Sequence, residues 1–176
     1  TGEGKSKFGN GIYITSSYDT AALYAAKAAK ANGLKDLYVY TVEVPDLTDD
    51  NHVFSCKVVN PSVIQKVEDR LGTIPEEAKS SGKYFRKYVG NVLIGKKATL
   101  KQMLDKADAS AENAVSRFFD EIGLVYLAWP QAQTKPDGDT NRAVLNATNI
   151  KIIKIEQVQV NEKHKLIQGS QKEIAL

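Results

Sequence analysis

Strand-like segments lie at both ends of this chain, and helix-like segments fill its middle. Near the start, "GIYIT" is a short apolar and β-branched run that indicates a strand. In "LYVYTVEVP" the side chains alternate in the two-residue period of a half-buried strand, which ends at Pro45. Later, "LVYLAW", "RAVLN" and "IKIIKIEQVQV" again indicate strands; the apolar phase of the last one breaks between Ile152 and Ile153, which predicts either a bulge or a strand covered on both faces. This order predicts an α+β domain with a small, mainly antiparallel β-core.

The length suits one domain that spans residues 1–176, because a chain of 176 residues buries roughly two thirds of the surface it exposes when unfolded. The single cysteine, Cys56, excludes an internal disulfide framework. No run approaches the ~18 to 20 apolar residues of a membrane helix, and "TGEGKSKFGN" lacks the apolar centre of a signal peptide. We therefore expect a soluble protein without a membrane span, compatible with the cytoplasm of a producing or a target cell.

Several helical segments have recognisable ends. For "TAALYAAKAAKA" we expect Asp19 as the N-cap and Asn32-Gly33 as the stop. For "SAENAVSRFFDEIG" we expect Ser110 as the N-cap and core positions for both phenylalanines. Further helices are predicted in "PSVIQKVEDRLG", "GKYFRKYVGNVL" and "TLKQMLDKA".

A cluster of cationic residues lies in the middle of the chain, mixed with aromatic ones. It consists of Lys83, Arg86, Lys87, Lys96, Lys97 and Lys101. Such a run is either a solvated helix face or a patch that meets a nucleic acid or an acidic protein surface. The formal net charge of +3 is modest and does not by itself require a polyanionic partner.

The sequence lacks the usual signatures of metal, phosphate and thiol chemistry. His52 and His164 are isolated, without the spacing of Cys/His or His/carboxylate ligands. No phosphate-binding loop with its lysine occurs, and no "GxGxxG" follows a strand. Cys56 lies in "FSCKVV" without a helix N-terminus to activate a thiolate. We therefore expect neither a metal site nor a cysteine nucleophile.

The stretch "KFGNGIYITSSYDTAALYAA" combines glycines and tyrosines. Gly9 and Gly11 flank Asn10 just before the first strand, where the absence of a Cβ lets the backbone approach a ligand closely. Tyr13 lies on that strand and Tyr24 on the next helix. Their rings are either core side chains or two faces of an aromatic clamp for a flat cationic ring, worth ~0.5 to 2 kcal/mol per contact. The nicotinamide of oxidised NAD is such a ring.

The same residues resemble a known family. "FGNGIYITSSYDTAALY" is similar to the central motif of the ADP-ribosyltransferase superfamily, in the branch of diphtheria toxin and the poly(ADP-ribose) polymerases. There a "GxGxY" strand is followed, after the same eleven-residue step, by a second tyrosine, and Tyr13 and Tyr24 match that step. The resemblance implies a split antiparallel β-core with helices, and NAD whose nicotinamide lies between the two rings.

Later segments are similar to the family in layout. "LYVYTVEVPD" resembles the strand after the family's first helix, and "DGDTNRAVLNATNIKI" resembles the late strand that opens with the catalytic glutamate. The span from "LYVYTVEVPD" to "NRAVLN" is also similar in layout to ADP-ribosyltransferase-like domains of large phage-borne polyvalent proteins.

The first family motif is absent. It is a His-Gly-Thr or His-Gly-Ser on the preceding strand, and neither His52 nor His164 is followed by glycine. We therefore expect a fragment or processed subunit without the first strand, which missing residues or a second chain supply, or else an intrinsically incomplete relative. Ala21 stands three residues before Tyr24, where polymerase relatives carry a carboxamide-binding serine and toxin-like relatives a small residue.

The catalytic position is altered as well. Alignment of "RAVLN" with the family's late strand places Asn141 at the position of the glutamate, with Asp139 two residues earlier. Cleavage of the nicotinamide bond builds positive charge on the ribose, and a carboxylate both orients the 2′-hydroxyl and steadies that charge, whereas an amide only orients. The resemblance therefore implies transfer of one ADP-ribose unit rather than chain elongation, with Asn141 or Asp139 facing the ribose.

The leading hypothesis is a mono-ADP-ribosyltransferase of the toxin or effector type, with NAD as co-substrate and a protein or nucleic acid as macromolecular acceptor. Its NAD-binding residues are Gly9, Gly11, Tyr13, Ala21 and Tyr24. One alternative is a catalytically inactive relative that binds NAD or a partner. Another is a structural or accessory domain of a phage-like particle, with both tyrosines in the core.

Overall fold

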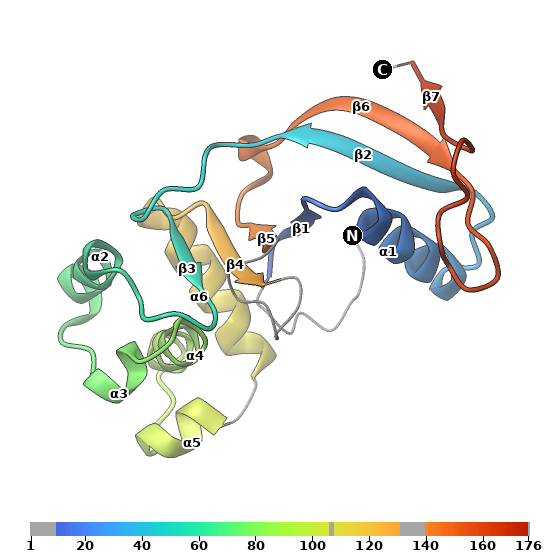
Figure 1. Ribbon diagram of the computed structural model, residues 1–176. Coiled ribbons are helices and arrows are strands. Elements are labelled where there is room, and N and C mark those ends of the chain that lie inside the picture. The colour runs from blue at the N-terminus through green and yellow to red at the C-terminus, as the bar shows by residue number, and fades with distance from the viewer. Residues whose placement is uncertain (1–9, 106–107, 131–139, 176) are drawn as a thin grey trace.

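The computed structural model describes residues 10–105, 108–130 and 140–175, and Figure 1 shows how their elements are arranged. The strands are β1 (Ile12–Thr15), β2 (Leu37–Glu43), β3 (His52–Phe54), β4 (Tyr126–Pro130), β5 (Thr140–Val144), β6 (Lys151–Val158) and β7 (Lys172–Ile174). The helices are α1 (Tyr18–Ala31), α2 (Pro61–Leu71), α3 (Glu76–Lys79), α4 (Gly82–Leu93), α5 (Leu100–Asp105), α6 (Ala109–Glu121) and the 3-10 turn η1 (Ala147–Asn149).

The strands form two sheets. The first has the order β1-β5-β4-β3 and is antiparallel except for the pair β3 and β4, and the second, β2-β6-β7, is wholly antiparallel. Figure 1 shows α2 to α6 gathered beside the first sheet and α1 beside the second. The predicted α+β class with mainly antiparallel strands is confirmed. The sequence pattern does not predict β3, β7 or α3, because elements of three or four residues show too little periodicity.

The main hydrophobic core lies between the first sheet and helices α4 and α6. Val53, Leu127 and Ala143 come from the sheet, Phe85 and Phe119 come from the helices, and each is at most 3% exposed. The two phenyl rings stack with their centroids 6.1 Å apart. The predicted core position of the α6 phenylalanines is therefore confirmed.

Helices α4 and α6 cross at Gly90 without room for a side chain. A Cβ on Gly90 would lie 2.6 Å from the carbonyl oxygen of Ala111, which is closer than real Cβ contacts. The close crossing sets the position of α6 over the first sheet, and with it the side chains that α6 presents toward β1.

The start of α1 differs from the prediction. Ser17, not Asp19, is the N-cap, and its Oγ accepts a hydrogen bond from the backbone N–H of Thr20 at 3.2 Å. Asp19 lies in the first turn instead, where its charge is favourable at the positive end of the helix. The predicted stop is confirmed, with Asn32 as the C-cap and Gly33 in the left-handed region at φ 65°.

The start of α6 differs in the same way. Asp108, not Ser110, is the N-cap, because its Oδ1 accepts a hydrogen bond from the backbone N–H of Ser110 at 2.9 Å. In both helices two good capping residues stand two positions apart, and the upstream one caps the helix. Local pattern alone does not distinguish such neighbours.

The bulge predicted in the last long strand is confirmed. Thr41 pairs with Lys154 and Val42 with Ile152, so Ile153 is the extra residue of β6. Ile152 is 45% and Ile153 50% exposed, so the alternative of a strand covered on both faces is wrong.

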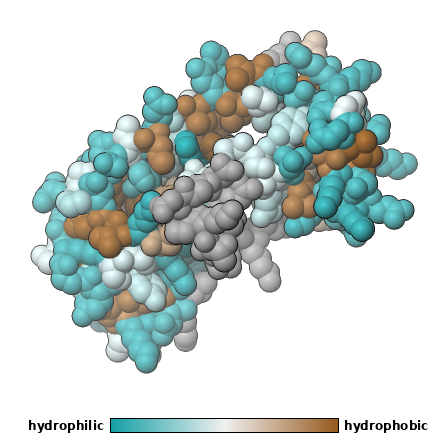
Figure 2. Space-filling model, viewed as in Figure 1, coloured by the Kyte–Doolittle hydropathy of each residue, from teal (hydrophilic) through white to brown (hydrophobic). Residues whose placement is uncertain are grey.

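The tyrosines of β2 face solvent. Tyr38 is 38% and Tyr40 53% exposed, whereas Val39 between them is buried against α1. On the face of the molecule in Figure 2, apolar side chains lie in separate groups among polar ones. Of the helices that the structure describes, none is both long and apolar enough to cross a membrane.

A buried carboxylate joins α1 to the second sheet. Ala22 and Val158 pack in the small core between them, and Glu156 beside it is 8% exposed. Glu156 accepts a hydrogen bond from the hydroxyl of Tyr18 at 3.0 Å and forms an ion pair with Lys154 at 3.0 Å. Burial, together with the hydrogen bond and charge of Glu156, raises the pKa of Tyr18 to about 12.

This shift predicts an alkaline loss of stability. The pKa of tyrosine in the unfolded chain is about 10, so the contribution of Tyr18 is complete below about pH 10 and is lost as the pH rises toward about 12. We expect the free energy of unfolding of the wild type to fall in this range relative to Tyr18→Phe, as measured by urea unfolding on both sides of about pH 10. Tyr40→Phe, at an exposed tyrosine, is the control. Parallel pH profiles for wild type and Tyr18→Phe contradict the prediction.

Candidate functional site

Tyr13 and Asn141 lie on the same face of the first sheet. On the paired strands β1 and β5, Tyr13 is directly opposite Ala143, and Thr15 is opposite Asn141. Residues that are opposite in a sheet, or two apart in a strand, point to the same side. The predicted ring-binding and ribose-facing residues are therefore neighbours in space, although they stand near opposite ends of the chain.

The ring of Tyr13 rests on Trp129. Their ring centroids are 5.1 Å apart with an interplanar angle of 56°. Trp129 is 7% exposed, so it is a rigid support, while Tyr13 on the end strand is 45% exposed. A tilted aromatic pair contributes about 0.5 to 1.5 kcal/mol beyond burial. Tyr13 therefore presents a held ring with accessible surface.

Tyr24 projects from α1 on the side away from the second sheet. Its side chain is 63% exposed, whereas Ala22 and Ala26 of the same helix are buried, Ala22 in the core shared with that sheet. The ammonium of Lys27 lies 5.4 Å from the centre of the Tyr24 ring. Ala21 is partly buried and packs against the core between α1 and β2. Tyr24 is thus accessible, as a ligand-binding ring requires.

Gly11 has a structural role at the start of β1. A Cβ on Gly11 would lie 2.7 Å from the carbonyl oxygen of Val144 and 3.1 Å from the Cβ of Ala143. The absent side chain therefore makes room for β5, not only for a ligand as the sequence suggested. The other predicted glycine, Gly9, lies outside the described residues.

Asn141 occupies the position expected to face the ribose. It is half-buried on β5, between Thr15 of β1 and Trp129 of β4. Its amide both donates and accepts hydrogen bonds but carries no charge. The alternative residue, Asp139, lies outside the described residues.

A buried ion pair lies beside Tyr13. Nε of Arg86 on α4 is 3.0 Å from Oε2 of Glu112 on α6, and the two side chains are only 6% and 12% exposed. Burial lowers the pKa of Arg86, and the charges of Glu112 and then Tyr13 oppose that shift. Burial raises the pKa of Glu112, against the cations Arg86 and Lys87. The pair therefore lies within electrostatic reach of the Tyr13 phenol.

The helical spacing of Arg86 indicated that it is buried, but the basic residues around it suggested an exposed surface. Arg86 stands three residues before Val89 and four before Gly90, so it belongs to the buried stripe of α4. As one member of a basic run, it is expected at a solvated face or a patch. Its burial shows that this expectation is wrong for Arg86.

The rest of the basic cluster is divided as well. Nζ of Lys87 donates to the carbonyl oxygen of Leu104 at 2.6 Å, and Lys96 forms an ion pair with Asp108 at 2.8 Å. Lys83, Lys97 and Lys101 are exposed. The cluster is therefore not one continuous cationic surface, which weakens its reading as a nucleic-acid patch.

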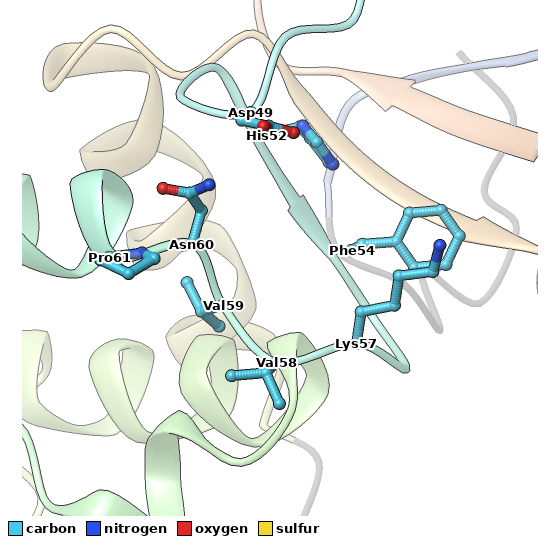
Figure 3. Close-up of a pocket in the computed structure, with 8 residues that line it drawn as sticks. All are labelled: Asp49, His52, Phe54, Lys57, Val58, Val59, Asn60 and Pro61. Carbon is cyan, nitrogen blue, oxygen red and sulfur yellow. The ribbon is translucent and has the colours of Figure 1, made fainter.

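Two cavities flank the first sheet. One, of about 350 Å³, lies between β3 and the start of α2 (Figure 3), where the ammonium of Lys57 is 5.0 Å from the centre of the Phe54 ring and Nδ1 of His52 is 2.7 Å from the carbonyl oxygen of Thr48. The other, of about 450 Å³, lies between the start of β1 and α6. The edge strands β3 and β1 are about 14 Å apart, and the second cavity lies on the side of Tyr13, because Gly11, two residues before Tyr13, lines it.

The histidines and the cysteine form no common centre. Cys56 is exposed. In the ranges that the structure describes, no group of three or more His, Cys, Asp and Glu side chains is arranged to hold a metal ion.

Comparison of the chain with protein-family models, with curated proteins and with solved structures finds no match in any of the three. The resemblance to ADP-ribosyltransferases therefore stays a prediction.

Removal of one member of the buried ion pair leaves an uncompensated charge. We expect Arg86→Met and Glu112→Met each to lower the free energy of unfolding by about 3 to 5 kcal/mol, and the double variant Arg86→Met/Glu112→Met to lose much less than the sum. Denaturant unfolding of the four proteins measures this coupling. Additive losses contradict the prediction.

Proposed function

We propose that this chain is an ADP-ribosyltransferase-like domain that binds NAD and transfers one ADP-ribose unit to a protein or nucleic acid, with release of nicotinamide. The observation that supports this best is the common sheet face of Tyr13 and Asn141. The two positions that the resemblance assigns to the ring and to the ribose come from distant parts of the sequence, and they are diagonal neighbours on paired strands of the first sheet.

The ring end of the site suits a flat cation. An aromatic face attracts a pyridinium ring through its quadrupole, and Trp129 holds the Tyr13 ring in place before the ligand arrives. In the proposal, Tyr24 supplies the second face of the clamp from α1. The cation of Arg86 beside Tyr13 is compensated by Glu112, so it does not repel the ligand with a full charge.

The chemistry requires the glycosidic bond between nicotinamide and the ribose C1′ to break. Nicotinamide leaves as a neutral molecule with the electron pair of that bond, and positive charge develops on the ribose. An acceptor nucleophile then bonds to C1′ and loses its proton. The Asn141 amide orients a ribose hydroxyl but adds no negative charge, so we propose slow transfer of single units.

One observation favours a second candidate, a module that binds NAD or a partner without turnover. The sheet position between Thr15 and Trp129 carries the neutral amide of Asn141 instead of a carboxylate. A domain retained only for binding has no need of that negative charge.

The reading with both tyrosines as core side chains is wrong, because Tyr13 is 45% and Tyr24 63% exposed. The hypothesis of a structural or accessory phage domain explained these rings as core side chains, and their exposure removes that explanation.

The test of the ring site is Tyr13→Ala. Loss of a stacking contact of ~0.5 to 2 kcal/mol weakens NAD binding by about two- to thirty-fold. Calorimetry measures the affinity, and nicotinamide release is followed on the same samples. Tyr38→Ala, at an exposed tyrosine of the second sheet, is the matched control and leaves both unchanged. If Tyr13→Ala binds and turns over NAD like the wild type, the proposed function is wrong.

Asn141→Ala separates the two candidates. For a transferase we expect nicotinamide release about 100-fold slower than in the wild type, with a smaller change in NAD affinity, because the amide acts mainly in the transition state. Asn149→Ala, the same substitution outside the sheets, is the control. Wild-type protein that binds NAD and releases no nicotinamide supports the binding module instead.

A further inference from the structure

The cavity of about 450 Å³ beside β1 is built mainly from one face of α6. It is lined by Asn10, Gly11 and Leu145 and by the α6 residues Asn113, Ser116, Arg117 and Asp120. The four helical positions follow the i, i+3, i+4, i+7 spacing of a single face, and all four are polar. Ligand cavities are typically about 300 to 1,000 Å³, so the size suits part of a nucleotide.

The cavity continues from the ring site. Gly11 stands just before β1 and two residues before Tyr13, about 6.6 Å away along the chain. A Cβ on Gly11 would lie 3.1 Å from the Cβ of Ala143, the residue opposite Tyr13, so both positions are on the same face of the sheet. The backbone N–H of Asn10 donates to Oγ of Ser116 at 3.1 Å, which fastens the start of the strand to α6. A ligand stacked on Tyr13 can therefore extend along β1 into this cavity.

The polar groups of the cavity differ in charge. Arg117 is exposed and, in the part of the chain that the structure describes, has no carboxylate within ion-pair distance. Oδ2 of Asp120 accepts a hydrogen bond from Nδ2 of Asn146 at 3.0 Å. The guanidinium of Arg117 suits a phosphate. A carboxylate and the amide of Asn113 on the same face suit hydroxyl groups, and the carboxylate disfavours a bare multiply charged anion.

We infer that this cavity binds the ribose and diphosphate portion of the dinucleotide. Arg117 binds the phosphates, and Asn113 and Asp120 bind ribose hydroxyls. The inference rests on the proposed function, which identifies the ligand as NAD. The contact between Arg117 and the phosphates is tested by binding of ADP-ribose, which requires no catalytic turnover.

The experiment divides the dinucleotide into its two halves. ADP-ribose lacks nicotinamide. The nicotinamide probe is the 1-methylnicotinamide cation, which keeps the positively charged ring of oxidised NAD and lacks phosphate. Calorimetry measures ADP-ribose binding. Quenching of Trp129, the single tryptophan of the chain and 5.1 Å from the Tyr13 ring, measures nicotinamide binding. We expect Arg117→Ala to weaken ADP-ribose binding about tenfold or more, because a charge-assisted hydrogen bond is lost, and to leave nicotinamide binding unchanged.

Two further variants complete the comparison. Arg70→Ala removes an exposed arginine of α2 and leaves both affinities unchanged. Tyr13→Ala weakens nicotinamide binding and leaves ADP-ribose binding nearly unchanged. Because Arg117 is exposed, its substitution leaves the fold intact, which the circular dichroism spectrum and the melting temperature verify.

The outcomes distinguish the two proposals. ADP-ribose affinity that is the same in Arg117→Ala and wild type overturns this inference, whereas nicotinamide affinity that is the same in Tyr13→Ala and wild type overturns the proposed function. Equal losses of ADP-ribose binding in Arg117→Ala and Arg70→Ala also overturn the inference, because they indicate a general charge effect. If neither probe binds the wild-type protein, both the inference and the proposed function are overturned.

Discussion

The antiparallel pairing of β1 with β5 is the contact on which the candidate site depends. It runs from Ile12 opposite Val144 to Thr15 opposite Asn141 and joins the beginning of the chain to a segment beyond α6. Closing so long a loop costs entropy, which other contacts must offset. The buried strand β4 and the fully buried Ala143 and Val144 supply them. Gly11 lets the two backbones approach at one end.

The first sheet and its helices distribute charge unevenly along β1. Near Tyr13, the cation of Arg86 is compensated by Glu112 within the protein. Further along α6, Arg117 has an exposed guanidinium at a cavity. Oxidised NAD is positive at its nicotinamide and negative at its diphosphate. A site that is neutral and aromatic at one end and presents an exposed guanidinium at the other suits that distribution.

The two tyrosines of the proposed clamp belong to different parts of the fold. Tyr13 lies in the first sheet, whereas Tyr24 lies on α1, whose alanine face packs on the second sheet. Only Ser16 and Ser17 connect β1 to α1, and Ser17 also caps the helix. This short connection keeps α1 next to β1, so a ligand held by both rings also joins the two parts of the domain.

The sequence by itself determined the main helices and longer strands and the α+β class, because each follows from periodicity and propensity over a few neighbouring residues. It located the irregularity at Ile152 and Ile153, and the strand pairing decided that this is a bulge. It misassigned the caps of α1 and α6, where two capable residues compete locally. The pairing of Arg86 with Glu112, the adjacency of Tyr13 and Asn141, and the cavity beside Arg117 were decided only by the tertiary structure. These contacts depend on how helices cross at Gly90 and in which register distant strands pair, and such long-range packing leaves no periodic signal in the chain.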